Sequence, residues 1–122
     1  MLQLPKRWQA LHRIGLPERK SYMVKIVVLY GQPDDPAAFE EYYAGTHVPL
    51  AAKMPNVRRF ESGQVLSSAD GGTPPYHRIA ELWFDNQEEL GAATSSAEGQ
   101  ATVADIANFA TGGAQVMIAE GD

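Results

Sequence analysis

The sequence predicts an α+β protein with the ferredoxin-like βαββαβ order, in which two helices cover one face of an antiparallel four-stranded sheet. Two observations lead to this prediction. Four segments have the composition or the alternation of β-strands, and the first and third intervals between them have helical spacing. The strands are expected at 23–30, 57–66, 76–84 and 114–120, and the helices at 36–54 and, in two pieces, at 85–93 and 95–109. Together they form one domain, residues 23–122.

The first strand, Met23 to Tyr30, is a β-branched and apolar run with the composition of a buried central strand. A turn follows it. Asp35 then has the side chain of an N-cap, and Pro36 fits the first position of a helix because its missing N–H is not needed there.

One face of the first helix is apolar except for a histidine. The residues on this face recur at spacings of four, four, three and four: Phe39, Tyr43, His47, Leu50 and Met54. Gly45 and Pro49 interrupt the helix beside His47, since proline removes a hydrogen-bond donor inside a helix. We therefore expect a helix that is broken at the histidine, with Thr46 as the N-cap of its second segment.

Alternate residues of the second and third strands point to opposite faces. In the second strand, Arg59 and Glu61 share one face, and Arg58 and Phe60 share the other. In the third strand, one face carries His77, Ile79, Glu81 and Trp83, and the other carries Tyr76, Arg78, Ala80, Leu82 and Phe84. Paired glycines and prolines between the two strands predict a loop.

The second helical region contains two start signals. Segments 85–88 and 95–98 each combine a capping side chain with a following glutamate. The first piece is expected to end near Ala93 and the second near Phe109. Gly112 and Gly113 then separate this region from the last strand.

Composition excludes several classes of function. The chain of 122 residues has no cysteine, which excludes disulfides, thiolate catalysis and cysteine-based zinc or iron–sulfur sites, and we expect a cytoplasmic location. The net charge of −5 argues against a nucleic-acid partner. No apolar run approaches the length of a membrane span, so no membrane association is expected.

The charge is unevenly distributed along the chain. Residues 1–22 contain five Lys or Arg and one acid, a net charge of +4, whereas residues 23–122 contain five basic and fourteen acidic residues, a net charge of −9. This shift predicts a boundary before Met23. We interpret residues 1–22 as a leader outside the core, with Met23 as the natural translation start and Met1 as a start assigned upstream of it. The alternatives are a transit peptide and a short amphipathic helix that docks on the domain.

The predicted sheet is apolar on both faces. Ile26 and Val27 point oppositely, as do Trp83 and Phe84. Two helices cover only one face, and an apolar second face is expected to be buried against a partner. The simplest partner is a second copy of the chain related by twofold symmetry, with Trp83 or Phe84 in or near the interface.

The first helix and the strand after it resemble the EthD family of small α+β proteins. A tyrosine-rich helix runs into the motif His47-Val48-Pro49-Leu50, and the segment PNVRRFESG follows at 55–63. The residues that carry the resemblance are Tyr43, His47, Pro49, Leu50, Lys53, Pro55, Val57, Arg58, Arg59 and Gly63. The resemblance covers residues 23–122 and implies a dimeric α/β barrel with a cleft between this helix and the sheet. The family is also associated with ether degradation and with a reductase label.

His47 is the candidate catalytic residue, because an imidazole exchanges protons near neutral pH. The alternative is a buried histidine with a structural role, and the resemblance favours the catalytic interpretation. Glu40 and Glu41 turn away from the face of His47. We therefore expect any acidic partner of the imidazole to come from a strand.

Four further residues are candidate substrate contacts. Tyr43 and Leu50 lie one turn on either side of His47, Arg59 is suited to an acidic or enolate group, and Glu81 shares a strand face with Trp83. Alternatively, Tyr43 is a core aromatic residue and Glu81 lies in the dimer interface. For Arg59 the alternative is an ion pair within the sheet, in which case Arg58 is the arginine that faces the cleft. No metal and no cofactor is expected, because the histidines are far apart in sequence and no nucleotide-binding motif occurs.

These residues predict a protein that binds a small, largely apolar molecule, such as an aromatic, polyketide-like or ether-pathway compound. His47 would act as general acid/base in an isomerase-, dehydratase- or oxidoreductase-type reaction. The alternative is a non-catalytic ligand-binding or accessory protein of an oxygenase pathway.

Overall fold

The computed structural model describes residues 22–121, in which the expected strands and helical regions follow one another in the predicted order. The elements are β1 (Val24–Gly31), α2 (Pro36–Tyr42), η1 (Tyr43–His47), α3 (Val48–Ala51), β2 (Arg59–Gln64), β3 (Tyr76–Phe84), α4 (Gln87–Ser95), α5 (Ala97–Asp105), η2 (Ile106–Asn108) and β4 (Ala114–Glu120). The expected leader, apart from Tyr22, lies outside the described residues.

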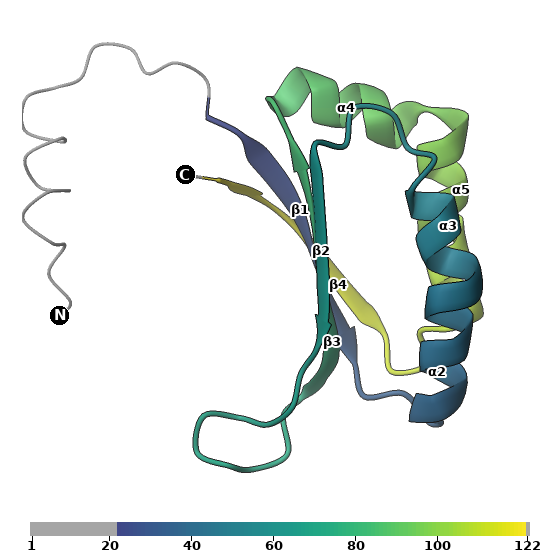
Figure 1. Ribbon diagram of the computed structural model, residues 1–122, viewed down its shortest axis with the longest axis vertical. Helices are drawn as coiled ribbons and strands as arrows, with labels where there is room; N and C mark the ends of the chain where they lie inside the picture. The colour runs from purple at the N-terminus through teal and green to yellow at the C-terminus, as the bar shows by residue number, and fades with distance from the viewer. Residues whose placement is uncertain (1–21, 122) are drawn as a thin grey trace, which may run out of the picture.

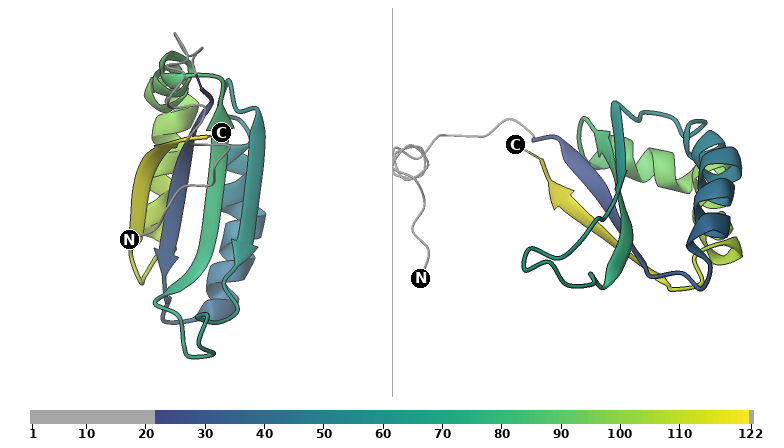
Figure 2. Two further views of the ribbon diagram at one scale, coloured as in Figure 1. Left: turned by 90° about the vertical axis from the view of Figure 1, so that its left-hand side faces the viewer. Right: turned by 60° about the horizontal axis from the view of Figure 1, so that its bottom comes forward.

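The four strands form one antiparallel sheet in the order β2-β3-β1-β4, and the helices form a second layer on one of its faces (Figure 1). This is the ferredoxin-like α+β fold that the sequence predicts. The central strands are β1 and β3, whereas β2 and β4 are the two edges (Figure 2).

The core lies between the sheet and the helices. Val24, Ile26, Val28 and Tyr30 alternate along β1 and are all buried on the helix-facing side, which we call the inner face. Phe84 is fully buried on the same side. The sequence analysis named Trp83 or Phe84 for a subunit interface, and of these two adjacent aromatic residues only Trp83 lies on the outer face.

The first helical region is wound more widely at its centre and is not broken. The N–H of Val48 donates to the carbonyl of Tyr43, five residues earlier, so Tyr43–His47 forms one π-helical turn between α2 and α3. Thr46 makes no capping hydrogen bond, and the expectation that it caps a second segment is wrong. A π-turn inserts one residue into the helix, which rotates all later side chains.

This rotation changes which residue follows His47 on the buried face. Ala51 is 6% exposed and points inward, whereas Leu50 is only half-buried. The inward-facing residues are therefore spaced by four positions from His47 to Ala51 and by three positions from Ala51 to Met54. The sequence pattern alone suggested the reverse order of these two intervals.

A β-bulge alters the faces of β3. The pairing of β1 with β3 shifts between Tyr30, which is opposite Arg78, and Gly31, which is opposite Tyr76, so His77 is the extra residue. His77 and Arg78 consequently both reach Glu40 of α2, with Nε2 of His77 2.8 Å from a Glu40 carboxylate oxygen. The prediction that His77 shares a face with Glu81 and Trp83 is thus wrong.

Candidate functional site

An apolar cavity of about 220 Å³ lies between the inner face of the sheet and the helices. Its floor consists of side chains from neighbouring positions on the four strands. Phe60, Leu82, Ile26 and Ile118 form one row across the sheet, because each is paired with the next. Ala80, Val28 and Val116 form the adjacent row, and Tyr30 lies beyond them on β1.

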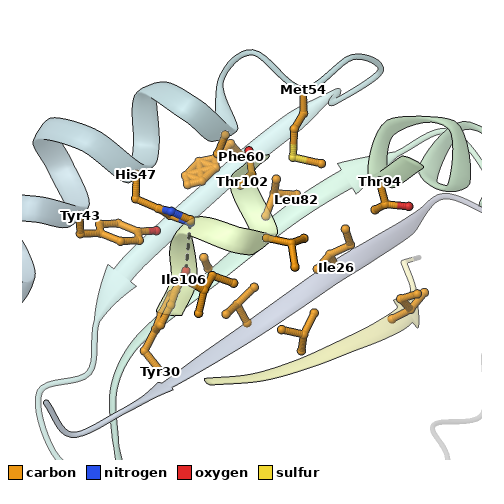
Figure 3. A pocket seen from close by; sticks show the side chains of 16 residues that line it. Ile26, Tyr30, Tyr43, His47, Met54, Phe60, Leu82, Thr94, Thr102 and Ile106 are labelled. Carbon is orange, nitrogen blue, oxygen red and sulfur yellow. Dashed lines mark hydrogen bonds between the residues drawn. The ribbon is translucent and has the colours of Figure 1, made fainter. Parts of the chain in front are cut away.

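The roof of the cavity comes from both helical regions. The first contributes Tyr43, His47, Ala51 and Met54, and the second contributes Thr94, Thr102, Val103 and Ile106. Figure 3 shows His47 and Tyr30 pointing toward one another at one end and Thr94 at the other. Among the described lining residues, none is a lysine, arginine, aspartate or glutamate. The cavity therefore suits an uncharged molecule.

His47 is held at this end by a carboxylate from the second helical region. Its Nδ1 lies 2.9 Å from Oδ2 of Asp105, and both side chains are buried, at 5% and 6% exposure. Asp105 also accepts hydrogen bonds at Oδ1 from the Tyr42 hydroxyl, at 2.6 Å, and from Nδ2 of Asn108, at 2.9 Å. The expectation that the acidic partner of His47 comes from a strand is wrong, because the end of α5 packs beside the π-turn.

These contacts determine the protonation of the pair. Burial acts to raise the pKa of the Asp105 carboxyl, but the hydrogen bonds from Tyr42, Asn108 and His47 outweigh it and lower this pKa below its usual value. Asp105 is therefore ionised at neutral pH and accepts from His47, so Nδ1 carries the proton. In the neutral imidazole, Nε2 is then the basic nitrogen, and it faces the cavity.

The second contact of the imidazole is looser. The hydroxyl of Tyr30 lies 3.4 Å from Nε2 of His47, beyond the usual length of a hydrogen bond between these atoms. Burial, together with the charge on Asp105 and the neighbouring Tyr43, raises the pKa of Tyr30, so its hydroxyl keeps its proton and serves as a donor. A ligand atom that contacts both groups from the cavity would face one acceptor and one donor.

Tyr43 forms the wall beside His47 and is fixed by a polar cluster outside the cavity. Its hydroxyl is 2.8 Å from Oγ of Ser62, which also accepts from Arg78 at 2.8 Å. The guanidinium of Arg78 lies 4.8 Å from the centre of the Tyr43 ring and pairs with Glu40. The hydrogen bonds from Arg78 and His77 lower the pKa of Glu40 despite its partial burial, so the Glu40 carboxylate is ionised near neutral pH.

The cavity reaches the surface between α5 and β4. Three apolar side chains that line it are largely exposed: Val103 at 58%, Val116 at 54% and Ile118 at 60%. Val116 and Ile118 belong to the inner face, but β4 is an edge strand that the helices leave partly uncovered. This opening, which we call the β4 mouth, gives a small apolar molecule a route to His47.

Two of the predicted site residues lie at the cavity and three do not. His47 and Tyr43 line it. Leu50 is rotated away by the π-turn. Arg59 and Glu81 are on the outer face, where Arg59 pairs with Glu61 and Glu81 pairs with Lys25 at 3.1 Å. Arg58 does not replace Arg59 at the cavity, since it is exposed and pairs with Asp85.

Sequence reasoning missed Tyr30 and Asp105. Tyr30 is the last inward-facing residue of β1, and a hydroxyl at the end of an otherwise apolar strand could have indicated a site residue. Asp105 carries no such signal, because it follows Val103 and Ala104 in a helix whose alignment with His47 depends on the tertiary packing. Within residues 22–121, no helix is long and apolar enough to cross a membrane, and no three His, Asp or Glu side chains are grouped as metal ligands.

The fold and this cavity define a small ferredoxin-like protein with a site between its helical layer and its sheet. A family model described as the EthD domain matches residues 32–113, a range that includes the π-turn, β2, β3 and Asp105. This chain belongs to the EthD family. It is also 42% identical, over 98 residues, to an uncharacterized 11.0 kDa protein from the thcB–thcC intergenic region of Rhodococcus erythropolis. The matched region covers 80% of this chain and 94% of that protein.

Solved structures give the same result. An EthD family protein from Bacillus halodurans is 35% identical, with a TM-score of 0.78 over 82% of this chain and 99% of that chain. A dimeric ferredoxin-like protein of unknown function from Thermobifida fusca is 15% identical, with a TM-score of 0.63 over 84% of this chain and 94% of that chain. The second likeness is one of fold alone.

Proposed function

We propose that this protein binds a small, uncharged, largely apolar molecule in the cavity and that His47 exchanges a proton with it. The observation that carries the proposal is the basic nitrogen of a buried imidazole facing an apolar cavity, with its other nitrogen bound to Asp105. A cavity of roughly 150 Å³ accommodates benzene. A volume of about 220 Å³ therefore suits one substituted ring, such as an aromatic or ether-pathway compound, better than a polycyclic polyketide.

The proposed chemistry begins with proton transfer from the ligand to Nε2 of His47. The resulting imidazolium is stabilised by the carboxylate of Asp105, 2.9 Å from Nδ1. Negative charge that develops on a ligand oxygen receives a hydrogen bond from the Tyr30 hydroxyl. His47 then returns the proton to another atom of the ligand, which completes an isomerisation, or to a departing hydroxyl group, which completes a dehydration. An oxidoreductase reaction would start with the same abstraction and needs an oxidant, for which molecular oxygen is suitable.

One observation favours a second candidate function, ligand binding without turnover. His47 is only 5% exposed, and its ring nitrogens lie 2.9 Å from Asp105 and 3.4 Å from the Tyr30 hydroxyl. In that case, His47 and Tyr30 would orient a bound molecule and Asp105 would stabilise the core. An accessory protein of an oxygenase pathway would use the cavity in this way.

The substitution His47→Asn separates the two functions, once thermal-shift screening of small uncharged aromatics and ethers has supplied a ligand. Asparagine keeps a hydrogen-bonding group but removes the base. If His47 is catalytic, turnover should fall about a hundredfold or more while ligand affinity changes little. Thr46→Asn, an exposed neighbour in the same turn, is the matched control and should keep full turnover. Full turnover in His47→Asn would contradict the catalytic proposal.

We also propose that the protein is a homodimer that buries the outer face of its sheet. Ile79 and Met117 are 37% and 44% exposed there. Within the described part of the chain, Nε1 of Trp83 is buried on this face without a hydrogen-bond partner, although Lys25 lies 4.6 Å from the ring centre. An exposed apolar face is typical of a surface that a partner covers, and the Thermobifida fusca protein of the same fold is described as dimeric.

A further inference from the structure

A second hollow lies on the far side of the cavity wall. It measures about 280 Å³ and is placed between α3 and β2, at the opposite edge of the sheet from the β4 mouth. Four residues line both spaces: Ala51, Met54, Phe60 and Leu82. We call the cavity at His47 the inner cavity and this second space the outer hollow.

Of these four side chains, Phe60 is the one that the fold holds least firmly. Ala51 has only a methyl group, and Leu82 and Met54 are each 7% exposed. Phe60 is 36% exposed and belongs to the edge strand β2, so it packs on one side and meets solvent on the other. It is also the last member of the floor row that runs from Ile118 across the sheet. Figure 3 shows Phe60 and Met54 on the side of the cavity opposite β4.

We propose that Phe60 is a specificity-determining residue that closes the inner cavity and sets the length of the molecule it accepts. This inference rests on the proposed function, since it assumes a ligand with a hydrogen-bonding group at His47 and Tyr30 and an apolar body along the floor row. With Phe60 in place, the ligand is a single substituted ring. Without its ring, the two spaces join, and a longer ligand fits between the sheet and α3.

The experiment measures how affinity depends on ligand length. Phenol and 4-alkylphenols up to 4-hexylphenol are uncharged at neutral pH, and the hydroxyl is suited to Nε2 of His47. Isothermal titration calorimetry compares the wild type with Phe60→Ala and with Phe60→Leu, which tests the same wall if the alanine variant is unstable. Val57→Ala is the matched control, because Val57 lines the outer hollow but not the inner cavity.

In the wild type, affinity should rise about fourfold for each buried methylene group and then stop rising when the inner cavity is full. In Phe60→Ala the rise should continue to longer chains, by about tenfold or more in affinity for 4-hexylphenol, while phenol binds as in the wild type. Val57→Ala should follow the wild type.

Two outcomes would overturn the inference in different ways. If the wild type and Phe60→Ala show the same dependence on chain length, the alkyl chain leaves through the β4 mouth and Phe60 is not the selecting wall, although the proposed binding function stands. If neither protein binds phenol or any alkylphenol, the proposed function fails and the inference fails with it.

Discussion

Asp105 connects the imidazole of His47 to the surrounding core. Its two carboxylate oxygens accept from His47, Tyr42 and Asn108, which come from η1, α2 and η2. Removing a carboxylate with several donors leaves those donors unsatisfied in a buried position, which costs more than the bonds themselves contribute. Asp105 therefore supports both the orientation of His47 and the stability of the helical layer.

The substitution Asp105→Asn should lower the free energy of unfolding at pH 7 by roughly 1–3 kcal/mol. The folded-state pKa of Asp105 lies below its usual value of 3.8. Its contribution is therefore complete above that value and is lost as the pH falls through the lowered pKa. The stability difference between wild type and variant should narrow as the pH is lowered from about 5 to 2.

Denaturant unfolding at several pH values measures this difference. Glu40 also has a lowered pKa and weakens both proteins in acid, so the comparison between them isolates Asp105. Glu41→Gln, at an exposed position of α2, is the control and should follow the wild type. A difference that stays constant over the whole pH range would contradict the ionised state assigned to Asp105.

The individual residues were not equally predictable from sequence. His47 and Tyr43 were identified because helical periodicity alone places them on the buried face. Arg59 and Glu81 were assigned to the site although strand alternation defines only which residues share a face, and it does not say which face the helices cover. The partner of His47 was not predictable, since Asp105 is 58 residues away and reaches it through the packing of two helices.

At the level of elements, periodicity predicted the order and the approximate bounds, but not two local irregularities. The π-turn at Tyr43–His47 exchanged Leu50 for Ala51 on the buried face, and the bulge at His77 moved a histidine from the outer to the inner face. Each inserts one residue, so the side chains before and after the insertion no longer follow one continuous periodicity. Gly45 and Pro49 correctly indicated that the helix is irregular at this point, but not the form of the irregularity.

Gly45→Ala tests whether the π-turn needs its glycine. Gly45 is exposed in helical conformation, and a Cβ atom there would have no neighbour within 4 Å. Alanine should therefore raise the free energy of unfolding by about 0.4–1 kcal/mol, because it reduces the freedom of the unfolded chain. Gly91→Ala in the regular helix α4, where the added Cβ is equally unhindered, is the matched control. A gain at Gly91 with a loss at Gly45 would show that the wide turn depends on glycine.

For the whole molecule, the sheet separates two functions. Its inner face forms the floor of the cavity, and its outer face combines apolar side chains with the ion pairs Lys25–Glu81 and Arg59–Glu61. Adjacent residues of β4 serve the two faces: Val116 pairs with Val28 of the inner face, and Met117 pairs with Val27 of the outer face. The sequence predicted two apolar faces, and the register assigns each residue to one of them.

Because Val116 and Met117 are adjacent in β4 but lie on opposite faces, substitutions at these two positions test the proposed cavity and the proposed dimer separately. Met117→Glu places a charge on the outer face and should convert a dimer into a monomer at micromolar concentration, because burying an unpaired carboxylate in an apolar interface is costly. Val116→Glu places the same charge at the β4 mouth, so it should leave the dimer intact and weaken ligand binding. Light scattering gives the mass relative to the 13.3 kDa chain, and circular dichroism shows that both variants are folded. A monodisperse wild-type monomer, or a dimer that Val116→Glu disrupts and Met117→Glu does not, would contradict the assignment of the outer face as the interface.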